Sequence, residues 1–169
     1  MKNNNIILIG MPGSGKSTVG VVLAKILGYN FCDLDLVISA RENSTLQNII
    51  DNRGLEEFLK CEQAAALSLE CENTVVATGG SVVLSEPGME KLSKMGTVVF
   101  FDVPYDELCD RIKNLKTRGI ACKPGDTLRD VYDQRIGLYN KYAQVTVDCE
   151  KTSFHDVIDK TLAAVKKGK

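Results

Sequence analysis

The sequence predicts an α/β fold in which helices cover both faces of a parallel sheet. Short runs rich in Val, Ile and Phe, typical of strands buried on both sides, alternate along the chain with segments of helical periodicity. Parallel strands need such crossovers, which are right-handed. The chain has 169 residues, enough for one compact domain, and we find no internal repeat. We therefore expect a single domain over residues 1–169.

The predicted elements follow one another in a regular order. The first strand, Asn5–Ile9, leads through a glycine-rich turn into a helix whose apolar residues recur at i, i+3, i+4 and i+7 from Val19 and which ends near Gly28. Four further strands are expected at Tyr29–Cys32, Thr74–Ala77, Thr97–Phe101 and Gln144–Val147. The later helices are expected at Thr45–Ile50, Gly54–Glu70, Met89–Lys94, Tyr105–Asn114 and Leu128–Tyr142, and a last one begins at Ser153, which forms a capping box with Asp156.

The composition excludes several classes of protein. Apolar residues make up 44% and charged residues 25%, which is ordinary for a globular chain and argues against disorder. Lys plus Arg number 21 against 22 for Asp plus Glu, so the net charge of -1 gives no electrostatic attraction for nucleic acid or a membrane surface. The apolar runs are too short to cross a bilayer, and the polar amino terminus lacks a secretory segment. We therefore expect a cytoplasmic protein with no nucleic-acid or membrane partner.

The six cysteines are scattered without a C-x-x-C pair, and the chain has one histidine. This pattern indicates neither a disulfide framework nor a zinc site. We expect reduced and mostly buried thiols.

The segment Gly10–Thr18 matches the pattern G-x-x-x-x-G-K-[ST] of a phosphate-binding loop and lies between a predicted strand and a predicted helix. In such loops, glycines let backbone N–H groups surround phosphate oxygens, and the helix N-terminus adds its positive end. Lys16 would reach the β- and γ-phosphates, and Ser17 would ligate Mg²⁺. The sequence therefore predicts binding of a nucleoside triphosphate by Gly13, Ser14, Gly15, Lys16, Ser17 and Thr18.

Guanine-specific switch proteins are disfavoured, because Asn140–Ala143 lacks the aspartate of Asn-Lys-x-Asp. Asp33 and Asp35 are more informative, since they follow a predicted strand at the sheet edge where α/β proteins bind ligands. On an extended backbone they point to the same side. One carboxylate can hold Mg²⁺ through water while the other accepts a substrate proton during phosphoryl transfer. The alternative is that Asp35 only caps a helix beginning near Leu36.

With these motifs the sequence resembles the shikimate kinase family over essentially its whole length. The resemblance includes the phosphate loop, Phe31–Asp35 and Thr78–Gly80, and Arg135–Tyr139 is similar to the R-x-P-L-Y motif of the family. It implies a P-loop kinase of the nucleoside-monophosphate-kinase type, with a sheet in the order 2-3-1-4-5, a substrate-binding segment at 33–62 and a mobile lid at 113–127. The implied reaction is ATP-dependent phosphorylation of the 3-hydroxyl of shikimate, with ATP and Mg²⁺ as cofactors. We expect a monomer.

The resemblance also implies roles for individual residues. Asp35 would bind the shikimate hydroxyls and act as base, and Asp33 would support Mg²⁺ together with Ser17. Gly79 and Gly80 would bring backbone N–H groups against shikimate, and Arg135 would pair with its carboxylate. Arg118 would move in with the lid to neutralise the transferring phosphoryl group, and Arg111 would stack on adenine. The expected catalytic residues are thus Lys16, Asp35 and Arg118.

The acceptor side of the site departs from the family pattern. The family has G-E-x-x-F-R where this chain has Gly54–Leu59, so that Leu55 replaces Glu and Leu59 replaces an Arg that grips the substrate carboxylate. Ser81 and Gly137 replace a glycine and a proline, whereas Glu62 matches a family acid. Losing a hydrogen bond to a charged group costs about 1.5–3 kcal/mol. Two alternatives therefore remain, a kinase of another polyol or hydroxy acid, such as gluconate, and an ATP-binding module without turnover.

Overall fold

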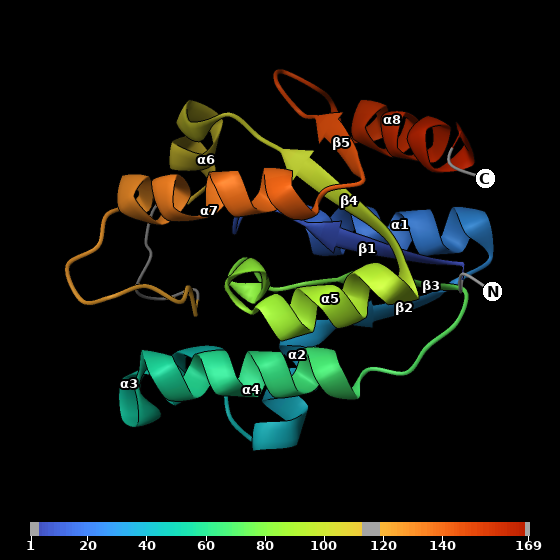
Figure 1. The fold of residues 1–169 in the computed structure, drawn as a ribbon. Coiled ribbons are helices and arrows are strands. Elements are labelled where there is room, and N and C mark those ends of the chain that lie inside the picture. Colours follow the sequence, from blue (N-terminus) through green and yellow to red (C-terminus); the bar gives the residue numbers. More distant parts are fainter. Residues whose placement is uncertain (1–3, 113–118, 168–169) are drawn as a thin grey trace.

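The computed structural model describes residues 4–112 and 119–167, which form three layers, helices on each side of a five-stranded sheet (Figure 1). The strands are all parallel and lie in the order β2-β3-β1-β4-β5. Their bounds are Asn5–Ile9 for β1, Asn30–Asp33 for β2, Thr74–Ala77 for β3, Gly96–Asp102 for β4 and Val145–Asp148 for β5. The predicted fold class and strand order are confirmed.

The central strands of the sheet are buried from solvent. All residues of β1 and β3 are buried, and β1 pairs with β3 on one side and β4 on the other. The polar residue at the start of β1 is satisfied, because the Asn5 amide donates to the backbone oxygens of Cys71 and Met95 and accepts the N–H of Thr74. A run of Val, Ile and Leu without alternation is therefore what this central position requires.

The helices divide between the two faces of the sheet (Figure 1). One face carries α1 (Lys16–Leu27) and α8 (Phe154–Lys167), which contact each other and the strands β3 and β5. The other carries α4 (Leu55–Ser68), α5 (Glu86–Met95), the short 3₁₀-helix η1 (Val82–Leu84) and α7 (Leu128–Tyr142). The remaining helices are α2 (Leu34–Glu42), α3 (Leu46–Arg53) and α6 (Tyr105–Arg111).

The segment from β2 to α4 has a small core of its own. Ile38, Ile49, Phe58 and Ala65 pack there with Ala121, apart from the main core around the sheet. Apolar contacts thus hold α2, α3 and α4 together as one unit beside the sheet edge. This unit covers the segment 33–62 that the sequence predicted to bind the substrate.

Two predicted helix starts were wrong, and one alternative that the sequence left open is excluded. Helix α2 begins at Leu34 rather than near Leu36, and its cap is Asp33, whose Oδ1 accepts the N–H of Asp35 at 3.0 Å. Asp35 is therefore not the cap. Helix α5 begins three residues before the predicted Met89, because Ser85 caps it. The prediction missed this start because the Pro-Gly pair that follows Ser85 is equally compatible with a turn.

Two further expectations concern the thiols and membrane-spanning helices. All six cysteines are free, but only Cys61 and Cys149 are buried, so the expectation of mostly buried thiols was wrong. No helix in residues 4–112 and 119–167 has the length and apolarity to span a membrane.

Candidate active site

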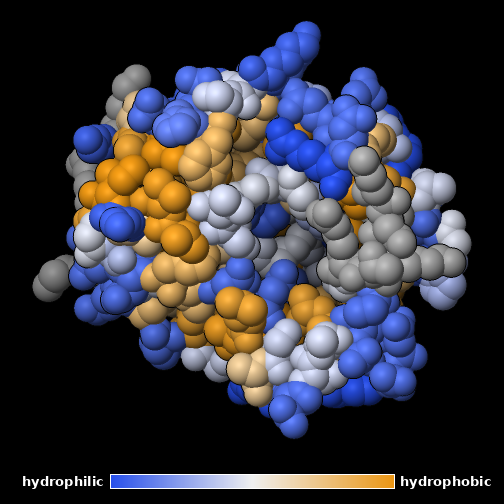
Figure 2. Space-filling view, turned by 180° about the vertical axis from the view of Figure 1, so that it is seen from behind, coloured by the Kyte–Doolittle hydropathy of each residue, from blue (hydrophilic) through white to orange (hydrophobic). Residues whose placement is uncertain are grey.

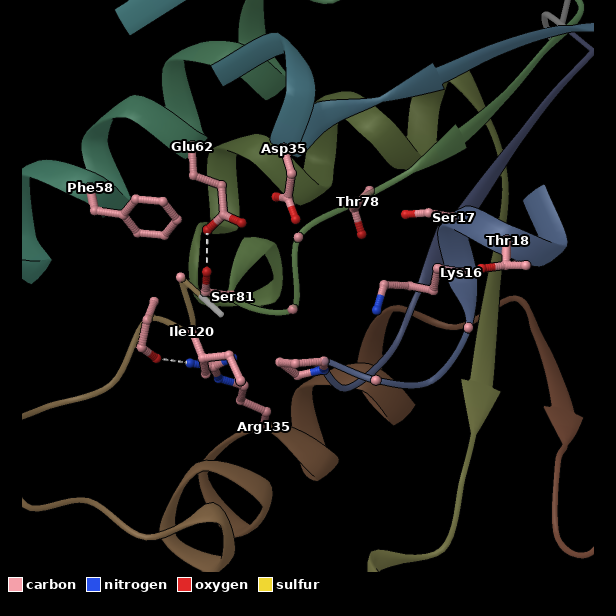
Figure 3. Close-up of a pocket in the computed structure, with 17 residues that line it drawn as sticks. Lys16, Ser17, Thr18, Asp35, Phe58, Glu62, Thr78, Ser81, Ile120 and Arg135 are labelled. Atoms are coloured by element: carbon pink, nitrogen blue, oxygen red, sulfur yellow. Dashed lines mark hydrogen bonds between the residues drawn. The ribbon is translucent and has the colours of Figure 1, made fainter. Parts of the chain in front are cut away.

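A cavity of about 420 Å³ lies at the carboxyl ends of β1 and β3, the edge of the sheet where α/β proteins bind ligands. It is lined by the phosphate loop, the first turn of α2, the side of α4, the loop after β3, residues 119–121 and α7. In Figure 3 the side chains of Asp35 and Glu62 enter from one side, Lys16 comes from the loop, and Arg135 lies on the opposite side. The surface seen in Figure 2 is hollowed near its middle, among mainly hydrophilic and neutral residues.

The phosphate loop has the backbone that its glycines allow. Gly13 and Gly15 have φ of 78° and 89°, a left-handed region in which a side chain would be strained. Lys16 Nζ is buried and donates to the backbone oxygens of Gly10 and Met11 at 2.8 and 2.9 Å and to Ser14 Oγ at 3.2 Å. Burial lowers the pKa of Lys16 to about 8, against the opposing attraction of Asp35 and Asp33. The loop therefore places a lysine and glycine N–H groups at the N-terminus of α1, which suits a phosphate chain.

Ser17 and Asp33 meet beside this loop, where Ser17 Oγ donates to Asp33 Oδ2 at 2.6 Å. A hydroxyl and a carboxylate next to a phosphate site fit Mg²⁺, which takes few protein ligands and keeps several waters. The described residues contain no cluster of three or more acidic, His or Cys side chains that would form an all-protein metal cage. The donor set thus agrees with a metal held jointly by the protein and the nucleotide.

Asp35 lies in the first turn of α2 and lines the cavity. It reaches the site from a helix, so the expected placement of both aspartates on one extended backbone was wrong, because β2 ends at Asp33. Burial and the neighbouring Asp33 raise the pKa of the Asp35 carboxyl, while Lys16 opposes the shift. A carboxyl that holds a proton more tightly than in water is a better proton acceptor once it is ionised.

Gly79 and Gly80 form the floor of the cavity, and the reason for each glycine is steric. A Cβ at Gly79 would overlap Glu62 Oε1 and lie 2.8 Å from Asp35 Oδ1, and a Cβ at Gly80 would lie 2.6 Å from the Pro12 ring. Tyr139 fixes this floor from below, because its hydroxyl donates to the Gly80 oxygen at 2.5 Å and its ring stacks on Phe100. Tyr139 thus both packs on Phe100 and holds the backbone of the floor through a hydrogen bond.

Arg135 is 1% exposed and lines the cavity from α7. Its Nη2 donates to the backbone oxygen of Ala121, and its Nε has no partner among the described residues. A buried guanidinium with a free donor next to a cavity calls for an anionic ligand. Its burial also rules out that Arg135 is a solvated surface charge.

Of the two arginines expected to contact the nucleotide, the structure describes only Arg111. Arg111 lies beside the loop, with its Nη1 3.5 Å from the Gly13 oxygen and its Nη2 paired with Glu107 at 3.1 Å. Arg118 lies outside the described residues, as does the lid from 113 to 118. In the described part of the lid, Gly119 donates its N–H to Gln47 Oε1 of α3 at 3.0 Å.

No other described cation replaces the missing arginine at position 59. Arg53 pairs with Glu42 and Glu57 at 2.6 and 3.3 Å, and Lys60 pairs with Glu56 at 3.1 Å, so both are engaged away from the cavity. Leu59 lines a neighbouring cavity of about 170 Å³ rather than the main one. Among the described residues, the acceptor side of the main cavity therefore has one arginine, Arg135.

Sequence reasoning missed how Glu62 and Ser81 are joined. Ser81 Oγ donates to Glu62 Oε2 at 2.6 Å, and both residues are buried in the cavity wall. The two departures at 59 and 81 were visible in the sequence, but nothing there indicated that the second one contacts Glu62. The spacing of Leu59 and Glu62, one turn apart on a predicted helix, was the only available signal.

A parallel sheet in the order 2-3-1-4-5, a lysine-bearing phosphate loop and a carboxylate facing it across a small cavity define a P-loop kinase of small molecules. The comparison with known proteins narrows this class. A family model described as shikimate kinase matches residues 12–166. The chain belongs to the shikimate kinase family.

Individual relatives agree with this assignment over nearly the full chain. The shikimate kinase of Sulfurihydrogenibium sp. (strain YO3AOP1) is 30% identical over 164 residues, which are 96% of this chain and 98% of that protein. The solved structure of a shikimate kinase from Acinetobacter baumannii in complex with shikimate superposes with a TM-score of 0.90 at 30% identity, covering 99% of this chain and 95% of that one. Threonine synthase-like 1 of Homo sapiens is 33% identical over 168 residues, 98% of this chain but 23% of that protein.

Proposed function

We propose that the protein transfers the γ-phosphoryl group of ATP to the 3-hydroxyl of shikimate. The observation that carries the proposal is the single cavity lined by Lys16, Asp35 and Arg135, three groups suited to a phosphate, a hydroxyl and a carboxylate. Shikimate carries both a hydroxyl to be phosphorylated and a carboxylate. Family membership and the likeness to a shikimate-bound structure support the same acceptor.

Each group has a task that follows from its position. The glycine N–H groups and Lys16 bind the phosphates. Lys16 exchanges its hydrogen bonds to the backbone oxygens of Gly10 and Met11 for contacts with the γ-phosphoryl group, where it stabilises the charge that develops. Ser17 and Asp33 would hold Mg²⁺, which would supply further neutralisation of phosphate charge when bound. Arg135 orients the acceptor through its carboxylate, and the floor at Gly79 and Gly80 lets the acceptor ring come close to the backbone.

Asp35 acts on the acceptor hydroxyl. Its carboxylate accepts the hydrogen bond of the 3-hydroxyl and takes the proton as the oxygen attacks the γ-phosphorus, in line with the leaving ADP oxygen. Because the transition state is loose, the larger part of the rate enhancement comes from positioning. Arg118 and Arg111 are assigned to the transferring phosphoryl group and to adenine by their family positions.

The lone described arginine on the acceptor side favours one alternative, another hydroxy acid such as gluconate. A coupled ADP-release assay over four compounds tests both: shikimate, its methyl ester, 3-dehydroshikimate and gluconate. We expect turnover with shikimate, weaker turnover with the ester, which lacks the charge for Arg135, and none with 3-dehydroshikimate, which lacks the accepting hydroxyl. Turnover with gluconate alone would replace shikimate as the acceptor, and no turnover with any compound would refute the kinase assignment.

A further inference from the structure

The second carboxyl of the cavity, Glu62, has no task in the reaction described above. It extends from α4, is 1% exposed, and uses only one of its oxygens: Oε2 accepts the Ser81 hydroxyl at 2.6 Å, while Oε1 has no partner among the described residues (Figure 3). A buried polar atom without a partner costs about 1–3 kcal/mol. An atom in this state beside a ligand cavity is available to a ligand.

The position of Oε1 is fixed by the floor of the cavity. The point above Gly79 where a Cβ would stand lies within contact distance of both Glu62 Oε1 and Asp35 Oδ1. An acceptor ring resting on Gly79 therefore has the carboxyls of both Asp35 and Glu62 within reach. Adjacent hydroxyls of a polyol are spaced to reach two such groups at once.

We propose that Glu62, oriented by Ser81, is a further acceptor-binding residue, whose Oε1 forms a hydrogen bond with a hydroxyl next to the one that is phosphorylated. The inference rests on the proposed function, because it takes the acceptor to be a polyhydroxylated acid. Ser81 is a positioning residue in this arrangement. It holds Oε2 and thereby turns Oε1 towards the cavity.

The neutral acid is the form that binds. Burial is the main cause that raises the pKa of Glu62 to about 7, and Asp35 adds to the shift, whereas the Ser81 hydrogen bond, Arg135 and Lys16 oppose it. Tyr139 also lies close enough to interact electrostatically with Glu62. An ionised Glu62 would repel both Asp35 and the carboxylate of the acceptor, whereas the neutral acid donates a hydrogen bond. A group with this pKa is mostly neutral at pH 6 and mostly ionised at pH 8.

Leu59 explains why the acid can stay neutral. Leu59 and Glu62 are one helical turn apart and line the same small cavity together with Ser81. A cation at position 59 would pair with Glu62 and keep it ionised. In this chain a leucine and a serine stand at those two places.

The test measures binding of shikimate by calorimetry without ATP, which needs no turnover, at pH 6 and pH 8. For the wild type we expect the Kd to be about tenfold weaker at pH 8, since only the neutral form of one group of pKa about 7 binds well. Glu62→Gln, which has the shape of the neutral acid, should remove this pH dependence. Glu56→Gln makes the same charge change at an exposed site of the same helix and should retain it.

Two further variants separate positioning from mere structure. Ser81→Ala removes the hydrogen bond that lowers the pKa and should move the midpoint of the Kd profile to higher pH, while Ser81→Thr restores it. A carbon-13 NMR titration of the Glu62 carboxyl should show the same midpoints without any acceptor. Titration of Glu62 near its ordinary value of 4.5, or equal pH dependence in Glu62→Gln and wild type, would overturn the inference. Binding of shikimate without ADP release would refute the proposed function alone, and absence of binding would refute both.

Discussion

A methyl group added at Gly79 should slow phosphoryl transfer while the fold is preserved. The Cβ of Gly79→Ala would stand 2.8 Å from Asp35 Oδ1, and an ordinary contact begins at 3.4 Å, so this oxygen must retreat by about 0.6 Å. Glu62 Oε1 must retreat further. A misplacement of 1 Å at a reacting group can cost about 10²-fold, so we expect kcat to fall by about 10- to 100-fold, or about 1.4–2.7 kcal/mol.

Stability should change little, because both displaced atoms are ends of flexible side chains and Gly79 does not have a positive φ. We expect a loss below about 1 kcal/mol, or about 2–4 °C in Tm. The matched control is Gly137→Ala, where nothing lies within 4 Å of the added Cβ and a helical alanine should add about 0.5–1 kcal/mol with turnover unchanged. ADP release and thermal melting of the two variants check this, and a Gly79→Ala enzyme with wild-type kcat would refute the placement of Asp35 over this floor.

Three other predictions concern the same cavity. Asp35→Asn should bind ATP normally but lose about 10²-fold or more in kcat, and near-normal turnover would remove Asp35 from the base role. Leu59→Arg should lower the KM for shikimate by about tenfold or more with little change in kcat, since the added guanidinium pairs with Glu62, cancels the repulsion between its charge and the acceptor, and adds uniform binding; an unchanged KM would show that position 59 does not reach the acceptor. Because burial lowers the pKa of Lys16 to about 8, the lysine loses its charge as the pH rises through that value. The affinity for ATP, measured by calorimetry between pH 7 and 9.5, should therefore fall around pH 8. An affinity that stays constant to pH 9.5 would contradict the low pKa.

The sequence predicted those features that depend on local pattern. Strands such as Asn5–Ile9 and Thr74–Ala77 are continuous apolar runs, and the helix Leu128–Tyr142 has a clear start at Thr127, so the structure reproduces all three with the same bounds. The phosphate loop was readable because its chemistry demands fixed glycines and a lysine at fixed spacing. Strand order came from family resemblance, since local pattern carries no information about which strands are neighbours.

The features that the sequence did not predict depend on contacts between distant residues. Asp33 and Asp35 are equally good helix caps by type, and only the end of β2 decides that Asp33 takes this place. Arg135 is typical of a solvated helix face by its neighbours, yet the packing of α7 buries it next to the cavity. The bond between Ser81 and Glu62 joins residues 19 apart, from the loop after β3 and from α4.

Asp33 links the two halves of the chemistry through one short side chain. Its Oδ2 accepts the hydroxyl of Ser17, and its Oδ1 accepts the backbone N–H of Asp35. Replacement of Asp33 would therefore remove both the hydrogen bond that orients Ser17 and the one that caps the helical turn carrying Asp35. Loss of activity in an Asp33 variant could therefore not be attributed to the metal site alone. Variants at Ser17 and Asp35 are needed to separate nucleotide binding from activation of the acceptor.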